Sequence, residues 1–86
     1  MIIQYTSKFK KQYKKLPQKF QNQFDKRLRL FLVDPTNSTL RVHPLKGSFR
    51  GYWSMNVNGD FRALYLRRGE EIIIFALIGT HSGLYS

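Results

Sequence analysis

The chain has 86 residues, which is enough for one domain with a single modest core. It contains no cysteine, so disulfides and thiolate metal sites cannot stabilise it. Fifteen lysines and arginines against five acidic residues give a formal net charge of +10, which favours a polyanionic partner, nucleic acid or the ribosome, over a merely solubilising surface. No stretch has the character of a signal peptide or a membrane span, which predicts a cytoplasmic protein with no membrane partner.

The first half of the chain predicts a short strand followed by two basic helices. Residues 2–5 suit a strand, and Ser7, or Thr6 before it, can cap a helix that Pro17 ends. Nine of the fifteen basic residues lie between Lys8 and Arg29. We expect a helical hairpin with its lysines facing solvent and its apolar stripes in the core. The stripe residues are Phe9, Tyr13 and Leu16 in the first helix, and Phe20, Phe24, Leu28, Phe31 and Leu32 in the second, which ends near Asp34-Pro35.

The second half predicts antiparallel strands, with a hairpin signalled by Val57-Asn58-Gly59-Asp60. A two-residue loop would put charges on an apolar face, whereas a three-residue loop over 57–59 pairs Asn56 with Asp60 and Ser54 with Arg62. Residues 67–69 mark the next turn, and residues 72–78, apolar on both faces, fit a central strand. The register with the longer loop predicts an apolar face of Trp53, Met55, Phe61, Ala63 and Tyr65, and a polar face of Tyr52, Ser54, Asn56, Asp60 and Arg62.

The polar face and the residues after the last strand offer groups that suit a phosphodiester. Metal-free RNA cleavage needs a group that takes a proton from the attacking 2′-hydroxyl, a group that protonates the leaving 5′-oxygen, and a cation beside the phosphate. His43 and His81 can exchange protons near neutral pH, and Arg62 can pair with two phosphoryl oxygens. Tyr85 can stack on an unpaired base.

Each of these residues also has a purely structural alternative. His43 could shape a strand entrance, Asp60 could complete the turn, Arg62 could be its cross-strand ion-pair partner, and Tyr85 could anchor the end of the chain. For the basic residues the alternative is a solvated surface. The candidates for contacting RNA or the ribosome are Lys10, Lys11, Lys14, Lys15, Lys46, Arg50 and Asn56.

The run His43-Pro-Leu-Lys-Gly-Ser-Phe-Arg-Gly-Tyr and the ending Gly79-Thr-His-Ser-Gly-Leu-Tyr resemble the RelE/ParE superfamily of bacterial type II toxins. The resemblance spans nearly the whole chain and is closest to the YafQ-like mRNA endonucleases, which end in the same Gly-Thr-His-Ser-x-Leu-aromatic pattern. It implies one α+β domain over residues 1–86 with a RelE-like fold. In this fold an N-terminal strand and a helical hairpin pack on a mainly antiparallel four-stranded sheet.

The resemblance also implies a function, which is ribosome-dependent cleavage of mRNA in the A site that leaves a 2′,3′-cyclic phosphate or a 3′-phosphate. His81 would be the general acid, and Asp60, alone or with His43, would be the base or orient it. Arg62 would stabilise the transition state, and Tyr85 would position the base or the scissile phosphate. A cognate antitoxin would cover the basic surface and the site, and operator DNA would be contacted only through the antitoxin complex.

Two positions depart from the family pattern. YafQ-like members carry an acid and a second histidine on the strand before the hairpin turn, and RelE-like members carry basic residues, where this chain has Ser54 and Asn56. Neither side chain can shuttle protons, so we expect activity below the family norm. Two alternatives stay open: a non-enzymatic inhibitor of DNA gyrase, like the ParE relatives that lack the C-terminal histidine motif, and an inactive module that binds RNA or the ribosome.

No cofactor or metal is expected. The two histidines and Asp60 follow no recognised ligand spacing, and the strong positive charge around them disfavours a divalent cation. The chain also has no phosphate-binding glycine loop.

Overall fold

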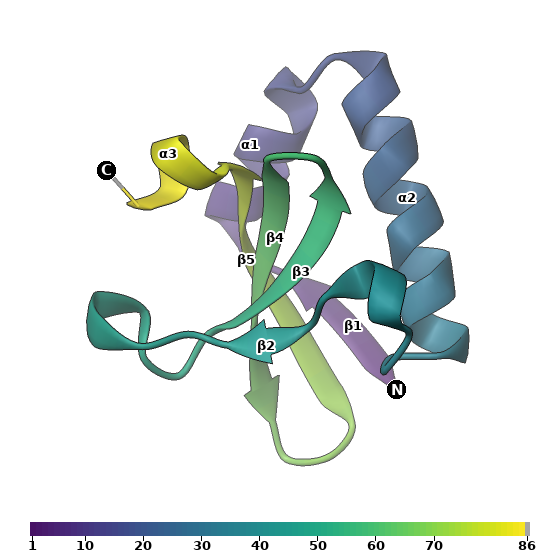
Figure 1. The fold of residues 1–86 in the computed structure, drawn as a ribbon, viewed down its shortest axis with the longest axis vertical. Coiled ribbons are helices and arrows are strands. Elements are labelled where there is room, and N and C mark those ends of the chain that lie inside the picture. Colours follow the sequence, from purple (N-terminus) through teal and green to yellow (C-terminus); the bar gives the residue numbers. More distant parts are fainter. Residues whose placement is uncertain (86) are drawn as a thin grey trace.

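Helices α1 and α2 cover one face of a mixed five-stranded sheet in this computed structural model, which describes residues 1–85 (Figure 1). The sheet order is β1-β5-β4-β3-β2, with β1 parallel to β5 and the other neighbours antiparallel. The strands are β1 (Ile2–Tyr5), β2 (His43–Pro44), β3 (Trp53–Asn58), β4 (Phe61–Arg68) and β5 (Ile72–Thr80). The helices are α1 (Ser7–Lys15), α2 (Gln18–Val33) and α3 (His81–Tyr85), and 3-10 turns lie at Ser38–Leu40 and Gly47–Phe49.

The predicted α+β class is confirmed, but the predicted four-stranded sheet was one strand too small. The extra strand is β2, in which His43 pairs with Ser54 and Pro44 pairs with Trp53. Proline is tolerated here because β2 is an edge strand, where one side of the backbone needs no partner. The pairing places His43 on the sheet itself.

The helical hairpin forms as its caps and apolar spacing predict. The Thr6 hydroxyl accepts the Phe9 N–H at 3.1 Å, so α1 starts at Ser7. Phe9 and Phe24 both pack on Phe75 of β5, with ring centroids 5.8 and 5.3 Å from it. Leu32 was wrongly predicted in the core stripe, since it is 45 % exposed; it lies about 100° around α2 from the buried Phe31. No helix within residues 1–85 is long and apolar enough to cross a membrane.

The β3–β4 hairpin differs in register from the prediction. Asn56 pairs with Arg62 and Ser54 pairs with Leu64, whereas the predicted three-residue loop would have paired Asn56 with Asp60. The predicted register of β3 against β4 was therefore wrong by two residues. Because a shift of two keeps the alternation of side chains, the strand residues still divide between the two predicted faces.

A β-bulge at Val57 explains this shift, since it leaves Gly59-Asp60 as a two-residue turn. Gly59 adopts a φ of +46°, and the side-chain amide of Asn56 donates to its carbonyl oxygen at 3.2 Å. Arg27 of α2 donates through Nε to the Val57 carbonyl at 3.1 Å. The bulge thus attaches the hairpin to the second helix.

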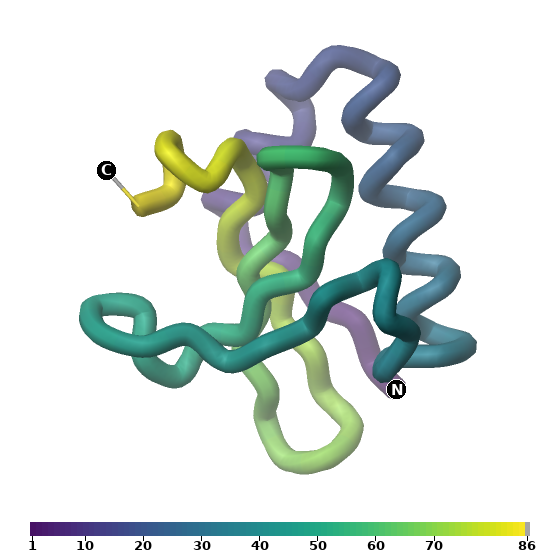
Figure 2. The backbone as a smooth tube through the Cα atoms, viewed as in Figure 1, coloured from purple at the N-terminus to yellow at the C-terminus, as the bar shows by residue number. Residues whose placement is uncertain are grey.

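The two faces of the sheet have different surroundings. Paired residues of neighbouring strands share a face, so His43, Ser54 and Leu64 lie in one row on the face opposite α1 and α2. Leu64 is fully buried, so the predicted polar face is partly apolar. The core on the other face consists of Phe9, Phe24, Phe31, Leu40, Met55, Val57, Ala63, Tyr65, Ile73, Phe75 and Ile78. Figure 2 shows α3 (yellow) and the loop of residues 45–52 (teal), which we call the β2–β3 loop, extending to the same side of the molecule.

Candidate active site

Four of the predicted site residues line one open cavity of about 260 Å³ next to α3. The lining residues are His43, Leu45, Arg62, His81 and Tyr85, and we call this cavity the His43–His81 pocket. They come from β2 and the start of the β2–β3 loop, from β4 and from α3, which are separate in sequence. Sequence reasoning missed Leu45, because an apolar residue in a loop gives no signal of a site.

The imidazole of His43 is held in one tautomer. Its Nδ1 lies 2.8 Å from the carbonyl oxygen of Arg41, and because a carbonyl can only accept, Nδ1 carries the proton. In the neutral ring, Nε2 therefore keeps its lone pair and can accept a proton. Arg41 adopts the left-handed conformation, with φ +46° and ψ +42°, which is uncommon for a residue other than glycine.

His81 and Tyr85 lie at the two ends of α3, and their ring centroids are 4.5 Å apart with an interplanar angle of 63°. The helix starts directly after β5, where the His81 N–H donates to the Asp60 carbonyl at 2.9 Å. The Gly83 N–H donates to the Thr80 hydroxyl at 3.0 Å. These bonds fix the start of α3 beside the hairpin turn.

Arg62 reaches the pocket from β4, with Asn56 and Gly79 as its partners on the neighbouring strands. Its partner on β3 is thus the amide side chain of Asn56, and not Ser54 as in the predicted register. Asp60 is exposed in the turn and is not among the residues that line the pocket. The backbone carbonyl of Asp60 contributes to the site, because it accepts the hydrogen bond from the His81 N–H.

Asn56 and Ser54 are buried beneath the surface. Asn56 is 8 % exposed and uses its side-chain amide to hold Gly59 in the turn. Ser54 is fully buried, and its Oγ has no hydrogen-bond partner within residues 1–85. The geometry therefore gives Asn56 a part in the hairpin turn, and it brings neither residue into the lining of the pocket.

The predicted RNA-binding cations fall into two groups. Lys46 and Arg50 are exposed in the β2–β3 loop, whose first residue, Leu45, lines the pocket. The exposed lysines of α1 belong to the helix that packs on the other face of the sheet, so they do not line the pocket; they are Lys10, Lys11, Lys14 and Lys15.

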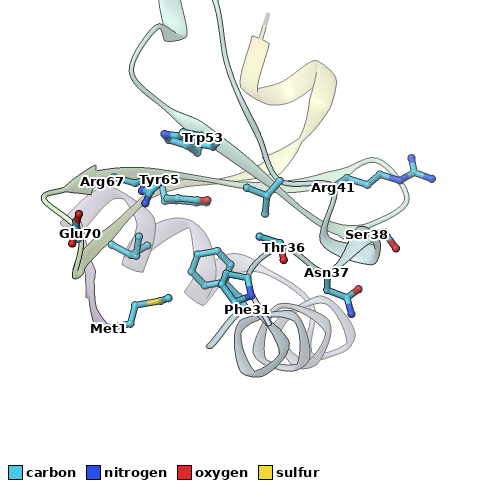
Figure 3. A pocket seen from close by; sticks show the side chains of 13 residues that line it. Met1, Phe31, Thr36, Asn37, Ser38, Arg41, Trp53, Tyr65, Arg67 and Glu70 are labelled. Atoms are coloured by element: carbon cyan, nitrogen blue, oxygen red, sulfur yellow. The ribbon is translucent and has the colours of Figure 1, made fainter. Parts of the chain in front are cut away.

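A larger cavity, of about 480 Å³, lies between the end of α2 and the opposite face of the sheet (Figure 3). The Phe31 and Tyr65 rings meet there at 5.4 Å, and the Arg67 guanidinium lies 5.3 Å from the centre of the Trp53 ring. Burial raises the pKa of Tyr65 to about 12. None of the residues proposed for catalysis lines this cavity, so we do not assign it to the active site.

Within residues 1–85, no three histidine, cysteine, aspartate or glutamate side chains lie close enough together to hold a metal ion. The reactive groups that line the His43–His81 pocket are two imidazoles, one guanidinium and one phenol. Imidazoles can transfer protons in both directions, and the guanidinium can stabilise an anionic phosphate. This set fits cleavage of a phosphodiester.

Comparison with known proteins agrees with this chemistry. The family model described as "Bacterial toxin of type II toxin-antitoxin system, YafQ" matches residues 1–86. The chain is 30 % identical over 89 residues to the mRNA interferase toxin YafQ of Escherichia coli strain K12, covering 96 % of this chain and 94 % of that protein. It resembles the crystal structure of YafQ from E. coli strain BL21(DE3) with a TM-score of 0.80 and 27 % identity, over 98 % of this chain and 97 % of that one. It shares the fold of a chain in the E. coli DinJ-YafQ toxin-antitoxin complex, with a TM-score of 0.74, 24 % identity and coverage of 98 % and 96 %. The fold predicted from the resemblance is confirmed.

Proposed function

The chain belongs to the YafQ family of type II toxin–antitoxin toxins and is an mRNA interferase, and from this premise we propose that it cuts mRNA in the ribosomal A site. The cut would be made in the His43–His81 pocket and would leave a 2′,3′-cyclic phosphate. The observation that carries the proposal is the gathering of His43, Arg62, His81 and Tyr85 around one cavity.

The proton transfers follow from the two imidazoles. His43 Nε2 takes the proton of the 2′-hydroxyl, and the 2′-oxygen forms a bond to the adjacent phosphorus. The bond from phosphorus to the 5′-oxygen breaks, and His81, in its imidazolium form, gives a proton to that leaving oxygen. The assignment of His43 as base is supported by its tautomer, because the Arg41 carbonyl occupies Nδ1–H and leaves Nε2 as the acceptor.

The remaining groups hold the phosphate and the base. Arg62 pairs with the phosphoryl oxygens as negative charge builds up on them, and Tyr85 stacks on a base or orients the scissile phosphate. Asp60 acts through its backbone, since its carbonyl binds the first amide of α3 and so positions His81. Its carboxylate is then not needed as the base.

The proposed partners follow from charge and family. Ribosomal RNA and mRNA are polyanions that suit a chain with a net charge of +10, and we propose that the toxin acts on them in the cytoplasm. YafQ of E. coli has been crystallised as a complex with DinJ. We propose that a cognate antitoxin likewise covers the basic surface and the pocket here, and that operator DNA is contacted only through that complex.

Primer extension on a reporter mRNA after brief induction tests this function. The parent chain should give discrete in-frame cuts, and a folded His81→Ala variant should cleave about 10²–10⁴-fold more slowly, which is the typical contribution of one general acid. His43→Ala should lose activity by a similar factor. Full cleavage by folded His81→Ala would reject the acid assignment. Intact mRNA together with supercoiling defects would instead point to a gyrase inhibitor.

A further inference from the structure

The last helix carries two pocket residues but is too short to hold them by itself. α3 has five residues, and a helix of this length is not stable in water without tertiary contacts. Hydrogen bonds donated by the backbone amides of His81 and Gly83 fix the start of the helix, and Leu84 packs over Gly79. Tyr85, at the other end, needs a contact of its own to keep its ring at the pocket.

Phe49 of the β2–β3 loop makes that contact. The ring centroids of Phe49 and Tyr85 are 5.1 Å apart at an interplanar angle of 88°, a favourable edge-to-face arrangement. Phe49 also meets Tyr52, at 5.8 Å and 75°. With the contact between Tyr85 and His81, these rings form a continuous aromatic array that joins the loop to α3.

The β2–β3 loop is built to present Phe49. It closes on itself, because the Leu45 N–H donates to the Tyr52 carbonyl at 2.9 Å and the Tyr52 N–H donates to the Phe49 carbonyl at 3.0 Å. Gly47 and Gly51 flank Phe49 with φ values of +66° and +97°, which other residues adopt only with strain. Leu45, at the start of the loop, already lines the pocket. The loop is thus one wall of the site, and Phe49 is its link to α3.

We infer that Phe49 is a positioning residue for RNA cleavage, which holds Tyr85, and through Tyr85 the His81 ring, in the reactive geometry. The inference rests on the proposed function. Phe49 is half-buried between Tyr85 and Tyr52, so it acts through Tyr85 and does not stack on RNA itself. A displacement of about 1 Å in an active site can cost about 10²-fold in rate. We therefore expect Phe49→Ala to slow cleavage by about tenfold to a hundredfold, with ribosome affinity unchanged.

The test measures single-turnover cleavage at saturating ribosomes programmed with a reporter mRNA. Phe49→Leu, which keeps apolar bulk without a ring, should be slow like Phe49→Ala, and Phe49→Trp should recover most of the rate. The matched control is Tyr5→Ala, since the Tyr5 ring also stacks on two aromatic rings but lies on β1, and it should keep the parental rate. A parental rate for Phe49→Leu, which is the variant more certain to fold, would overturn the inference.

A double-mutant cycle separates positioning from direct contact with RNA. In the Tyr85→Ala background, Phe49→Ala should cause no further loss, and a second loss of about tenfold would show that Phe49 acts on the RNA itself, against the inference. Proton NMR of the free protein gives a readout that does not depend on cleavage. Phe49→Leu should change the ring-current shifts of the Tyr85 and His81 ring protons, and unchanged shifts would also overturn the inference. If those shifts change as expected but the parent chain cleaves no mRNA, the proposed function is what fails.

Discussion

At the scale of single residues, a backbone carbonyl decides which nitrogen of His43 can accept a proton. Nδ1 lies 2.8 Å from the Arg41 carbonyl oxygen and donates to it, so only Nε2 is free to accept the proton of the 2′-hydroxyl in the proposed reaction. The left-handed backbone of Arg41, with φ +46°, brings this carbonyl into place. The strained conformation of one residue is thereby linked to the chemistry of its neighbour two positions on.

Arg62 should contribute to the rate more than to binding. In the proposed reaction its guanidinium interacts most strongly as charge develops on the phosphate, so Arg62→Ala should lower the single-turnover rate at saturating ribosomes by about 10²–10³-fold. Arg62→Lys keeps the charge but loses the planar fork, so its rate should be intermediate. A change confined to apparent affinity would reassign Arg62 to substrate binding.

Ser54 should be replaceable without loss of stability. Its hydroxyl is fully buried and has no hydrogen-bond partner within residues 1–85, which costs about 1–3 kcal/mol. Ser54→Ala should therefore leave the free energy of unfolding in urea unchanged or raise it by about 1 kcal/mol. The matched control is Thr6→Val, which removes a hydroxyl that caps α1 and should cost about 1 kcal/mol. A clear loss of stability in Ser54→Ala would mean that its hydroxyl does find a partner in solution.

Four of the five pocket residues could be selected from the sequence by type, because histidine, arginine and tyrosine side chains suit the chemistry of RNA cleavage. The exact roles of these residues could not be predicted from the sequence. The tautomer of His43 depends on the dihedral angles of Arg41, for which the sequence gives no signal. The sequence did not indicate a role for Phe49, because its contact with Tyr85 joins segments that are far apart in the chain.

At the scale of elements, the hairpin shows what alternation can and cannot determine. The pattern of apolar residues correctly divided β3 and β4 between two faces, because that division has a period of two residues. It could not fix the register, since a shift of two leaves the pattern intact. The bulge at Val57 set the register, and a bulge depends on local hydrogen bonds such as that of Asn56 to Gly59.

One of the hydrogen bonds that join α1 to α2 can be tested by substitution. The Tyr13 hydroxyl donates to Asp25 Oδ1 at 2.9 Å, so Tyr13→Phe leaves a half-buried carboxylate without its donor. We expect urea unfolding to show a loss of about 1.5–3 kcal/mol at neutral pH. Asp25→Asn, alone and with Tyr13→Phe, completes a cycle whose coupling energy should be clearly above zero. Additive losses would show that the bond does not join the helices in solution.

The same pair predicts how stability depends on alkaline pH. Burial, and then the hydrogen bond to Asp25, raise the pKa of Tyr13 above its ordinary value of 10.0. A group whose pKa is higher in the folded state stabilises the fold fully below its unfolded pKa and loses this contribution as pH rises through the folded value. Stability should thus decline above about pH 10, and it should decline less in Tyr13→Phe.

At the scale of the whole molecule, charge and chemistry occupy different faces. The His43–His81 pocket lies on one face of the sheet and is bordered by the β2–β3 loop, which carries Lys46 and Arg50, whereas α1 packs against the other face. A partner that uses the full charge of +10 must therefore extend around the domain. The ribosome is large enough to do so.

Salt dependence tests whether α1 contacts the ribosome. Each phosphate that a lysine neutralises releases condensed counterions, so the logarithm of affinity falls with the logarithm of salt by about 0.7 per contact on single-stranded RNA. Replacing Lys10, Lys11, Lys14 and Lys15 by alanine should therefore reduce the slope of ribosome affinity against salt by about three, for every mRNA sequence alike.

The control is a variant with arginine at the same four positions, which keeps the charge and should keep the slope. Because these lysines lie outside the pocket, cleavage at saturating ribosomes should change little in the alanine variant. Identical slopes for the parent and the alanine variant would show that α1 does not touch the ribosome, and its lysines would then serve only to keep the toxin in solution or to bind its antitoxin.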